Sequence, residues 1–122
     1  MKKKAIIISI KGLKLTNKEK LLLSKESPWG LILFERNIKS LSQIKTLITN
    51  IKKLTRDKNF PILIDEEGSA VSRLRNIINH NINAKYFGNL FVKNKKLSIK
   101  LYKNYLNSLC KNLKDIGINI NT

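Results

Sequence analysis

The chain has 122 residues, a formal net charge of +17, and 42% hydrophobic and 27% charged residues. This globular composition excludes a disordered chain, and no apolar run approaches the roughly 20 residues of a membrane span. The single cysteine, Cys110, excludes an intrachain disulfide and favours a reducing compartment. We therefore expect a cytoplasmic protein without a membrane partner, forming one small domain or part of a larger one.

The first half of the chain alternates apolar runs with helix-start signals. Thr16-Asn17-Lys18-Glu19 has the form of a capping box, and Leu21 to Leu23 are expected to form the buried side of its helix. Ser40 and Gln43 form a second box before an apolar stripe at helical spacing, Ile44 to Leu54. The nearly continuous apolar runs are typical of strands buried on both faces. These predicted strands are 5–10, 30–34 and 60–65.

The second half of the chain begins with an ambiguous, asparagine-rich segment at 75–94, where we expect a loop with a short helix near 84–90. A long helix is predicted at 95–115, and Gly117 is a suitable residue to end it in the left-handed conformation. A last short strand is expected at 118–120.

This order of strands and helices predicts an α/β fold with a parallel sheet and right-handed crossovers. Two architectures fit the pattern: an open doubly wound sheet, or part of a (β/α)₈ barrel. A complete barrel needs about 250 residues, so 122 residues supply only half of one.

Polar residues follow two of the predicted strands, at the end where parallel α/β folds place their ligands. Glu35, Arg36 and Asn37 follow the second strand, and Asp65-Glu66-Glu67-Gly68 follows the third. Three acids directly after a buried strand are costly unless they bind something or cap a helix. We interpret Asp65 as a binding group, and Glu66 and Glu67 as solvent-facing or helix-capping residues.

These same stretches resemble glycoside hydrolase family 3. The segment from Gly30 to Asn37 is similar to the family's "GvILF-x-RN" pattern, and the segment from Pro61 to Gly68 is similar to "P-L-x-I-D-x-E-G-G". Val71 to Leu74 matches "V-x-R-L", and Gly117 to Asn121 resembles "G-I-x-x-N". The combination, in order along the chain, identifies residues 1–122 as a partial N-terminal barrel domain of the family's β-N-acetylhexosaminidase branch.

The resemblance implies retaining hydrolysis of glycosides that carry N-acetylglucosamine, in cell-wall fragments, without a cofactor or metal. It assigns sugar binding to Asp65 and Arg73, with Arg73 also holding Asp65 in place, and makes Glu67, Arg36 and Asn37 candidates for the surroundings of the pocket. No catalytic residue is expected in this chain, because the family's nucleophilic Asp and acid His belong to later segments. A carbohydrate is then the substrate, and a second chain that completes the barrel is the candidate protein partner.

The sequence departs from the family pattern at Ser69 and Ala70, which replace a glycine and an arginine. Two alternatives therefore stay open: an inactive remnant of such an enzyme, and a basic nucleic-acid-binding protein suggested by the net charge. The positive charge is nearly all lysine and is spread along the expected helices, so no specific nucleic-acid partner is expected.

Three single residues are expected to have structural roles. His80 is the only histidine, but it follows the third strand, where the family has no catalytic histidine. Cys110 falls on the apolar side of the last helix and is expected to be packed. Trp29 precedes the second strand, away from the polar strand ends, and is also expected to be packed.

Overall fold

The computed structural model describes residues 3–78 and 82–122, in which four parallel strands alternate with helices. The predicted order of elements is confirmed, with boundaries that differ by a few residues. The elements are β1 (Lys4–Ile8), α1 (Asn17–Glu26), β2 (Pro28–Leu33), the short 3₁₀ helix η1 (Glu35–Asn37), α2 (Leu41–Thr55), β3 (Ile62–Ile64), α3 (Ala84–Lys93), α4 (Lys95–Ile116) and β4 (Ile120–Asn121).

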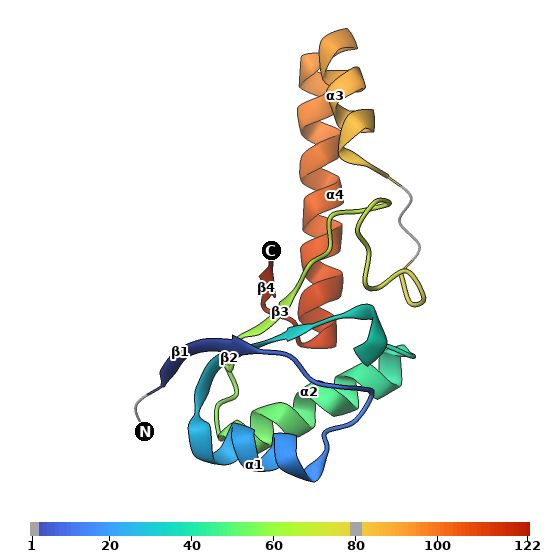
Figure 1. Ribbon diagram of the computed structural model, residues 1–122. Helices are drawn as coiled ribbons and strands as arrows, with labels where there is room; N and C mark the ends of the chain where they lie inside the picture. The colour runs from blue at the N-terminus through green and yellow to red at the C-terminus, as the bar shows by residue number, and fades with distance from the viewer. Residues whose placement is uncertain (1–2, 79–81) are drawn as a thin grey trace.

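The strands lie in the order β1-β2-β3-β4, and every neighbouring pair is parallel. Each connection between neighbours contains at least one helix, as parallel pairing requires. Figure 1 shows α1 and α2 side by side below the sheet and α4 rising from it. The predicted α/β class with a parallel sheet is therefore confirmed, and neighbouring strands of the sheet are also consecutive along the chain.

The helix starts follow the predicted caps, with one difference. At α1 the box is complete, because the Thr16 hydroxyl accepts from the Glu19 amide and Glu19 accepts from the Thr16 amide. At α2 the Ser40 hydroxyl accepts from the Gln43 amide at 3.2 Å, but the Gln43 side chain accepts from the Lys39 amide instead. The second box is thus only a single cap, because the side chain of Gln43 is bound elsewhere. Its Nε2 donates to the carbonyls of Leu13 and Asn37.

The core lies between the sheet and the helices. All three residues of β3 are buried, as predicted for a strand covered on both faces. The predicted stripe of α2 belongs to the same core, except Leu54, which is half-buried. In α1 only Leu23 is buried, and Leu21 and Leu22 are exposed. The fully buried side chains of the core include Leu31, Leu33, Ile44, Ile51, Phe60, Ile62, Ile64 and Leu74.

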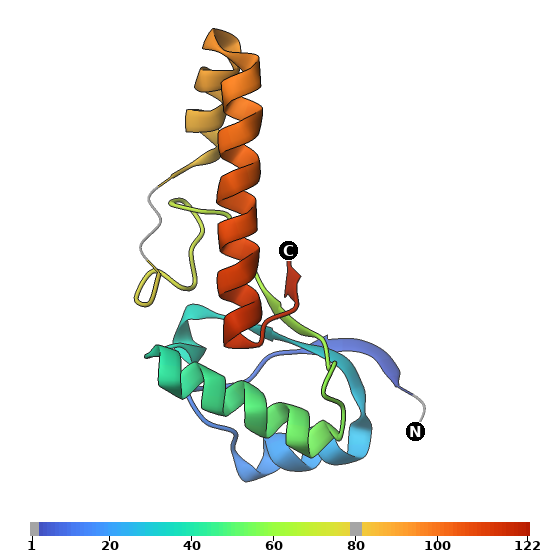
Figure 2. The same cartoon turned by 180° about the vertical axis from the view of Figure 1, so that it is seen from behind.

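The long helix α4 has two different halves. Its C-terminal half buries Leu109, Leu113 and Ile116 in the core, and Gly117 ends it at φ 103° as predicted. Its N-terminal half extends beyond the sheet and packs against α3, in both views (Figures 1 and 2). The prediction for Cys110 was wrong: the thiol is exposed, because it lies about 100° around the helix from Leu109.

Trp29 is also not packed, since 41% of its surface is exposed. Alternate side chains of a strand share a face, so Trp29 lies on the face of the buried Leu31, and its exposure belongs to the beginning of β2 and not to that whole face. The edge strand β1 is similarly open, with Ile6 and Ile7 about half exposed. Burial on both faces therefore holds for the inner strand β3 and not for β1.

Candidate functional site

The polar residues predicted from the strand ends gather at one edge of the sheet. Leu33 of β2 pairs with Ile64 of β3, so the residues that follow these two strands start side by side. Ile64 pairs in turn with Asn121 of β4. We call residues 34–37, 65–75 and 121–122 the polar edge, and it is the candidate functional site.

Asp65 and Arg73 form an ion pair at the centre of the polar edge. Nη2 of Arg73 donates to Oδ2 of Asp65 at 3.0 Å, and each side chain keeps 28% of its surface exposed. The contact that the sequence predicted between them is present. The second carboxylate oxygen and the remaining N–H groups of the guanidinium suit a ligand that both donates and accepts hydrogen bonds, such as a hydroxyl group.

Phe34 brings a second arginine to this pair. Cζ of Arg36 lies 4.5 Å from the centre of the Phe34 ring, and Cζ of Arg73 lies 5.9 Å from it, so both guanidinium groups are within cation–π range. Nε of Arg36 also donates to the carbonyl of Ile10 at 3.1 Å. Arg36 therefore lies close to the pair, and its place beside a sugar pocket stays a prediction.

Asn37 lies at the same edge but has no exposed surface. Its Nδ2 donates to the carbonyls of Ile10 at 3.1 Å and Gly12 at 3.0 Å, and its Oδ1 accepts from the Phe34 amide at 2.9 Å. These bonds fix the loop after β1 against the loop after β2. Asn37 therefore has a structural role at the polar edge, because its side-chain amide is buried and bound to backbone groups.

The two glutamates after Asp65 differ from one another. Glu67 is exposed, as expected, and its amide donates to the carbonyl of Val71 at 2.8 Å. Glu66 is buried, with 1% exposure, so the interpretation of Glu66 as solvent-facing or helix-capping was wrong. Its Oε2 accepts from the amides of Arg73 at 2.8 Å and Leu74 at 2.9 Å. Burial is tolerated because backbone donors stabilise the carboxylate.

Asn121 is a further residue that sequence reasoning did not assign to the site. Its Oδ1 accepts from the Glu66 amide and its Nδ2 donates to the Glu66 carbonyl, both at 2.9 Å. The Asn121 side chain thus makes, just beyond β3, hydrogen bonds to the backbone of the kind that a neighbouring strand would make. Only the resemblance of Gly117 to Asn121 to a family pattern pointed to this position, and it gave no role.

Gly68 and Tyr105 border the same loop. Gly68 has φ +116°, and a Cβ placed on it would lie 2.6 Å from the carbonyl oxygen of Ile82, so only glycine fits without a shift. Burial raises the pKa of Tyr105, and the negative charge of Glu66 adds to this effect. The helix α4 therefore contributes Tyr105 to the inner side of the loop that carries Arg73.

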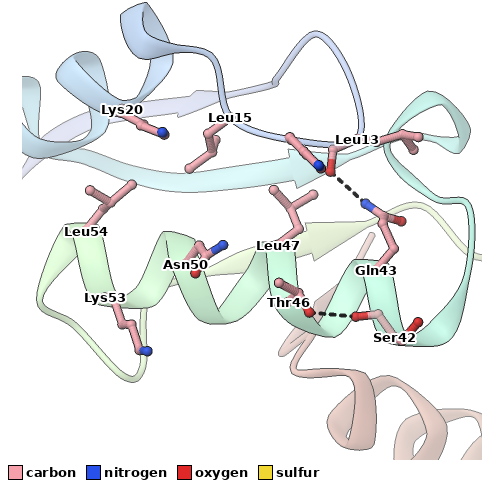
Figure 3. Close-up of a pocket in the computed structure, with 11 residues that line it drawn as sticks. Leu13, Leu15, Lys20, Ser42, Gln43, Thr46, Leu47, Asn50, Lys53 and Leu54 are labelled. Atoms are coloured by element: carbon pink, nitrogen blue, oxygen red, sulfur yellow. Dashed lines mark hydrogen bonds between the residues drawn. The ribbon is translucent and has the colours of Figure 1, made fainter.

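A hollow of about 900 Å³ lies elsewhere, between the start of α1 and α2. Figure 3 shows Leu15, Leu47 and Leu54 along it, and the hydrogen bond of Gln43 Nε2 to the Leu13 carbonyl at 2.8 Å. None of its lining residues belongs to the polar edge. Its size alone does not make it the functional site, because no ionised pair converges there.

Within residues 3–78 and 82–122, no group of three or more His, Cys, Asp and Glu side chains is placed to hold a metal ion. Over the same residues, no helix combines the length and the apolar character that crossing a bilayer requires. His80 lies outside the described residues, so its expected structural role stays a prediction.

The chain is a parallel α/β protein that has a partly exposed ion pair, Asp65–Arg73, at the carboxyl ends of its strands. No family model matches the chain. A beta-hexosaminidase of Nitrosomonas eutropha is 30% identical over 94% of this chain and 33% of its own length. A beta-hexosaminidase of Haemophilus influenzae is 38% identical over 58% of this chain and 20% of its own length. The chain thus spans a fifth to a third of the curated relatives it matches.

The solved structures agree with these relatives. NagZ from Neisseria gonorrhoeae, in complex with N-trifluoroacetyl-D-glucosamine, superimposes with a TM-score of 0.81 and 29% identity over 93% of this chain and 34% of that chain. A glycoside hydrolase family 3 beta-N-acetylglucosaminidase from Paenibacillus shares the fold, with a TM-score of 0.82 over 94% of this chain and 21% of that chain, at 22% identity. The predicted resemblance is confirmed: the chain is similar to the N-terminal portion of family 3 glycoside hydrolases of the beta-hexosaminidase type.

Proposed function

We propose that the polar edge binds the sugar of a glycoside that carries N-acetylglucosamine. Asp65 accepts hydrogen bonds from sugar hydroxyls, and Arg73 donates to sugar oxygens while it holds Asp65 in place. The observation that carries this proposal is the partly exposed Asp65–Arg73 pair at 3.0 Å. The pair lies at the carboxyl ends of parallel strands, where α/β enzymes bind their ligands.

We further propose that the whole enzyme is a β-N-acetylhexosaminidase that acts on cell-wall fragments in the cytoplasm by a retaining mechanism. That mechanism uses a nucleophilic carboxylate and a general acid on opposite sides of the scissile bond. The polar edge residues described above bind sugar, and the two reacting groups come from further segments of a complete barrel. Either the same polypeptide or a second chain supplies these segments. The similarity to about a third of a NagZ chain supports this division of roles.

Hydrolysis of a chromogenic N-acetylglucosaminide tests the proposal. We expect turnover when the chain is combined with the polypeptide that supplies the rest of the barrel, and no turnover by the chain alone. Asp65→Ala abolishes this turnover. Asp57→Ala is the matched control, because Asp57 is also a partly exposed carboxylate in an ion pair, with Lys3 at 2.7 Å, but lies away from the polar edge. Absence of turnover in every combination would indicate an inactive remnant.

A nucleic-acid-binding function rests on a different observation, the net charge of +17. It predicts binding to DNA or RNA whose affinity falls steeply as salt is raised, because each neutralised phosphate releases counterions. Asp65→Ala removes a negative charge and would strengthen such binding slightly, whereas it abolishes sugar binding. The two functions therefore respond to this substitution in opposite directions.

A further inference from the structure

The buried carboxylate of Glu66 binds the backbone at the far end of its own loop, seven and eight residues further along the chain. Its Oε2 accepts from the backbone amides of Arg73 and Leu74 at 2.8 and 2.9 Å. Leu74 is fully buried and belongs to the hydrophobic core, so this end of the loop is anchored at a fixed place. A charged acceptor makes both bonds stronger than bonds between neutral groups.

The backbone of Glu66 is itself held from the other side. Asn121 exchanges two hydrogen bonds with the amide and carbonyl of Glu66, both at 2.9 Å. Between Glu66 and Arg73 the chain closes on itself through the bond from the Glu67 amide to the Val71 carbonyl at 2.8 Å. The loop is therefore a closed unit, with Asn121 fixing its start and the Glu66 side chain fixing its end.

This unit determines where the guanidinium of Arg73 lies. Ordering an arginine side chain costs up to about 2 kcal/mol of conformational entropy. If the backbone of Arg73 were also free to move, holding the guanidinium in a single orientation would cost more. Here the Arg73 amide is bound to Glu66, and the Arg73 guanidinium returns to Asp65, the neighbour of Glu66. The two adjacent carboxylates therefore have separate roles, because Glu66 holds the backbone of Arg73 and Asp65 holds its side chain.

We propose that Glu66 is a positioning residue for sugar binding, which holds the loop 66–74 so that Arg73 is presented to Asp65 and to the sugar. This inference rests on the proposed function of the Asp65–Arg73 pair. Glu66 is buried and does not touch the sugar itself. It acts only through the place that it gives to Arg73.

Glu19 provides a matched control for this role. It also accepts from two backbone amides of a loop after a strand, Lys11 and Thr16, both at 2.7 Å. That loop follows β1 and lies outside the polar edge. A substitution at Glu19 therefore removes the same kind of loop bonds but none that Arg73 makes, and the loop stays attached to the polar edge through the bonds from Asn37 to the carbonyls of Ile10 and Gly12.

The experiment compares Glu66→Met, Glu66→Gln and Glu19→Met with the unsubstituted chain, each labelled with ¹⁵N. Methionine keeps the side-chain length but removes the acceptor, whereas glutamine keeps an oxygen that accepts from both amides. The first readout is the Nε–Hε signal of Arg73, assigned by its loss in Arg73→Lys. The second readout is the affinity for N-acetylglucosamine, measured by shifts of the backbone amides of residues 65–74. All measurements are made below the onset of thermal unfolding.

We expect Glu66→Met to broaden the Arg73 signal and to weaken N-acetylglucosamine binding by about tenfold, as for one lost hydrogen bond. Glu66→Gln restores most of both, and Glu19→Met changes neither. An unchanged Arg73 signal with unchanged affinity in folded Glu66→Met would overturn the inference. If no chain binds the sugar, yet Glu66→Met still broadens the Arg73 signal, the proposed function fails while the positioning of Arg73 by Glu66 stands.

Discussion

The loop after β1 and the loop after β3 are each held by a glutamate whose carboxylate accepts hydrogen bonds from two backbone amides. In the first loop Glu19 lies in a capping box at the start of α1 and binds the amides of Thr16 and Lys11. In the second, Glu66 is buried and binds the amides of Arg73 and Leu74. The first holds a helix start, whereas the second holds a residue of the candidate site. The same kind of hydrogen bond therefore holds a helix start in one place and, in our proposal, positions a binding residue in the other.

The largest difference is expected from removing the two carboxylates. Glu66→Ala leaves the buried amide of Leu74 and the part-buried amide of Arg73 without an acceptor. Each unsatisfied buried group costs about 1–3 kcal/mol, so we expect a loss of about 3 kcal/mol in the free energy of unfolding. Glu19→Ala exposes its donors to water and costs about 1 kcal/mol, as the loss of a helix cap does. Urea denaturation of both variants measures this. Equal losses would show that the two loops are held alike.

Two glycines sharpen the same comparison. Gly68→Ala places a Cβ 2.6 Å from the Ile82 carbonyl at φ +116°, so we expect a loss of about 2 kcal/mol from strain. Gly12→Ala, in the loop after β1, meets nothing within 4 Å and should change stability by less than about 0.5 kcal/mol. Thermal unfolding of the two variants provides the test, and a Gly68→Ala protein as stable as Gly12→Ala would contradict the assigned strain.

The loop after β1 is expected to lose stability in acid, because it is held by the carboxylate of Glu19. Burial tends to raise the pKa of Glu19, but the backbone hydrogen bonds from Thr16 and Lys11 outweigh it and hold the pKa below its ordinary value of 4.5. Glu19 therefore contributes stability above pH 4.5, and this contribution is lost as the pH falls through the lowered folded-state pKa. Glu19→Gln should show a smaller loss of stability between about pH 6 and pH 3. Glu26 and Asp57 have lowered pKa values too, but they are present in both proteins. Parallel stability profiles would contradict this role.

The smallest effect on stability is expected at the ion pair itself. Asp65 and Arg73 are each 28% exposed, and such pairs contribute about 0–1 kcal/mol. Asp65→Ala and Asp57→Ala should therefore both unfold within about 1 kcal/mol of the unsubstituted chain. Urea denaturation distinguishes this from a structural role for Asp65, which a much larger loss would reveal.

The sequence predicted what depends on neighbours along the chain. The strands and helices followed from their periodicity, the cap at Thr16 from a pattern of four residues, and Gly117 from its place after the last helix. The contact of Asp65 with Arg73 was also predicted, because the family resemblance placed both in one pocket. These signals are all contained in short segments or in motifs of a known spacing.

What could not be predicted depends on long-range packing. Glu66 and Glu67 are adjacent residues of one type, and the family pattern, which matches only Glu67 to a fixed position, does not say which of them is buried; the closure of the loop decides it. The exposure of Cys110 follows from which face of α4 the core covers, since its neighbours Leu109 and Leu113 are buried. The bonds of Asn121 to Glu66 join residues 55 apart in the sequence.

The most direct test of the account is a titration of the ¹⁵N-labelled chain with N-acetylglucosamine, followed through the backbone amides. The account predicts saturable shifts at residues 34–37 and 65–74, which disappear in Asp65→Ala and persist in Asp57→Ala. Shifts centred instead on the hollow around Leu13, Gln43 and Leu47, or no shifts at all, would contradict the assignment of sugar binding to the polar edge.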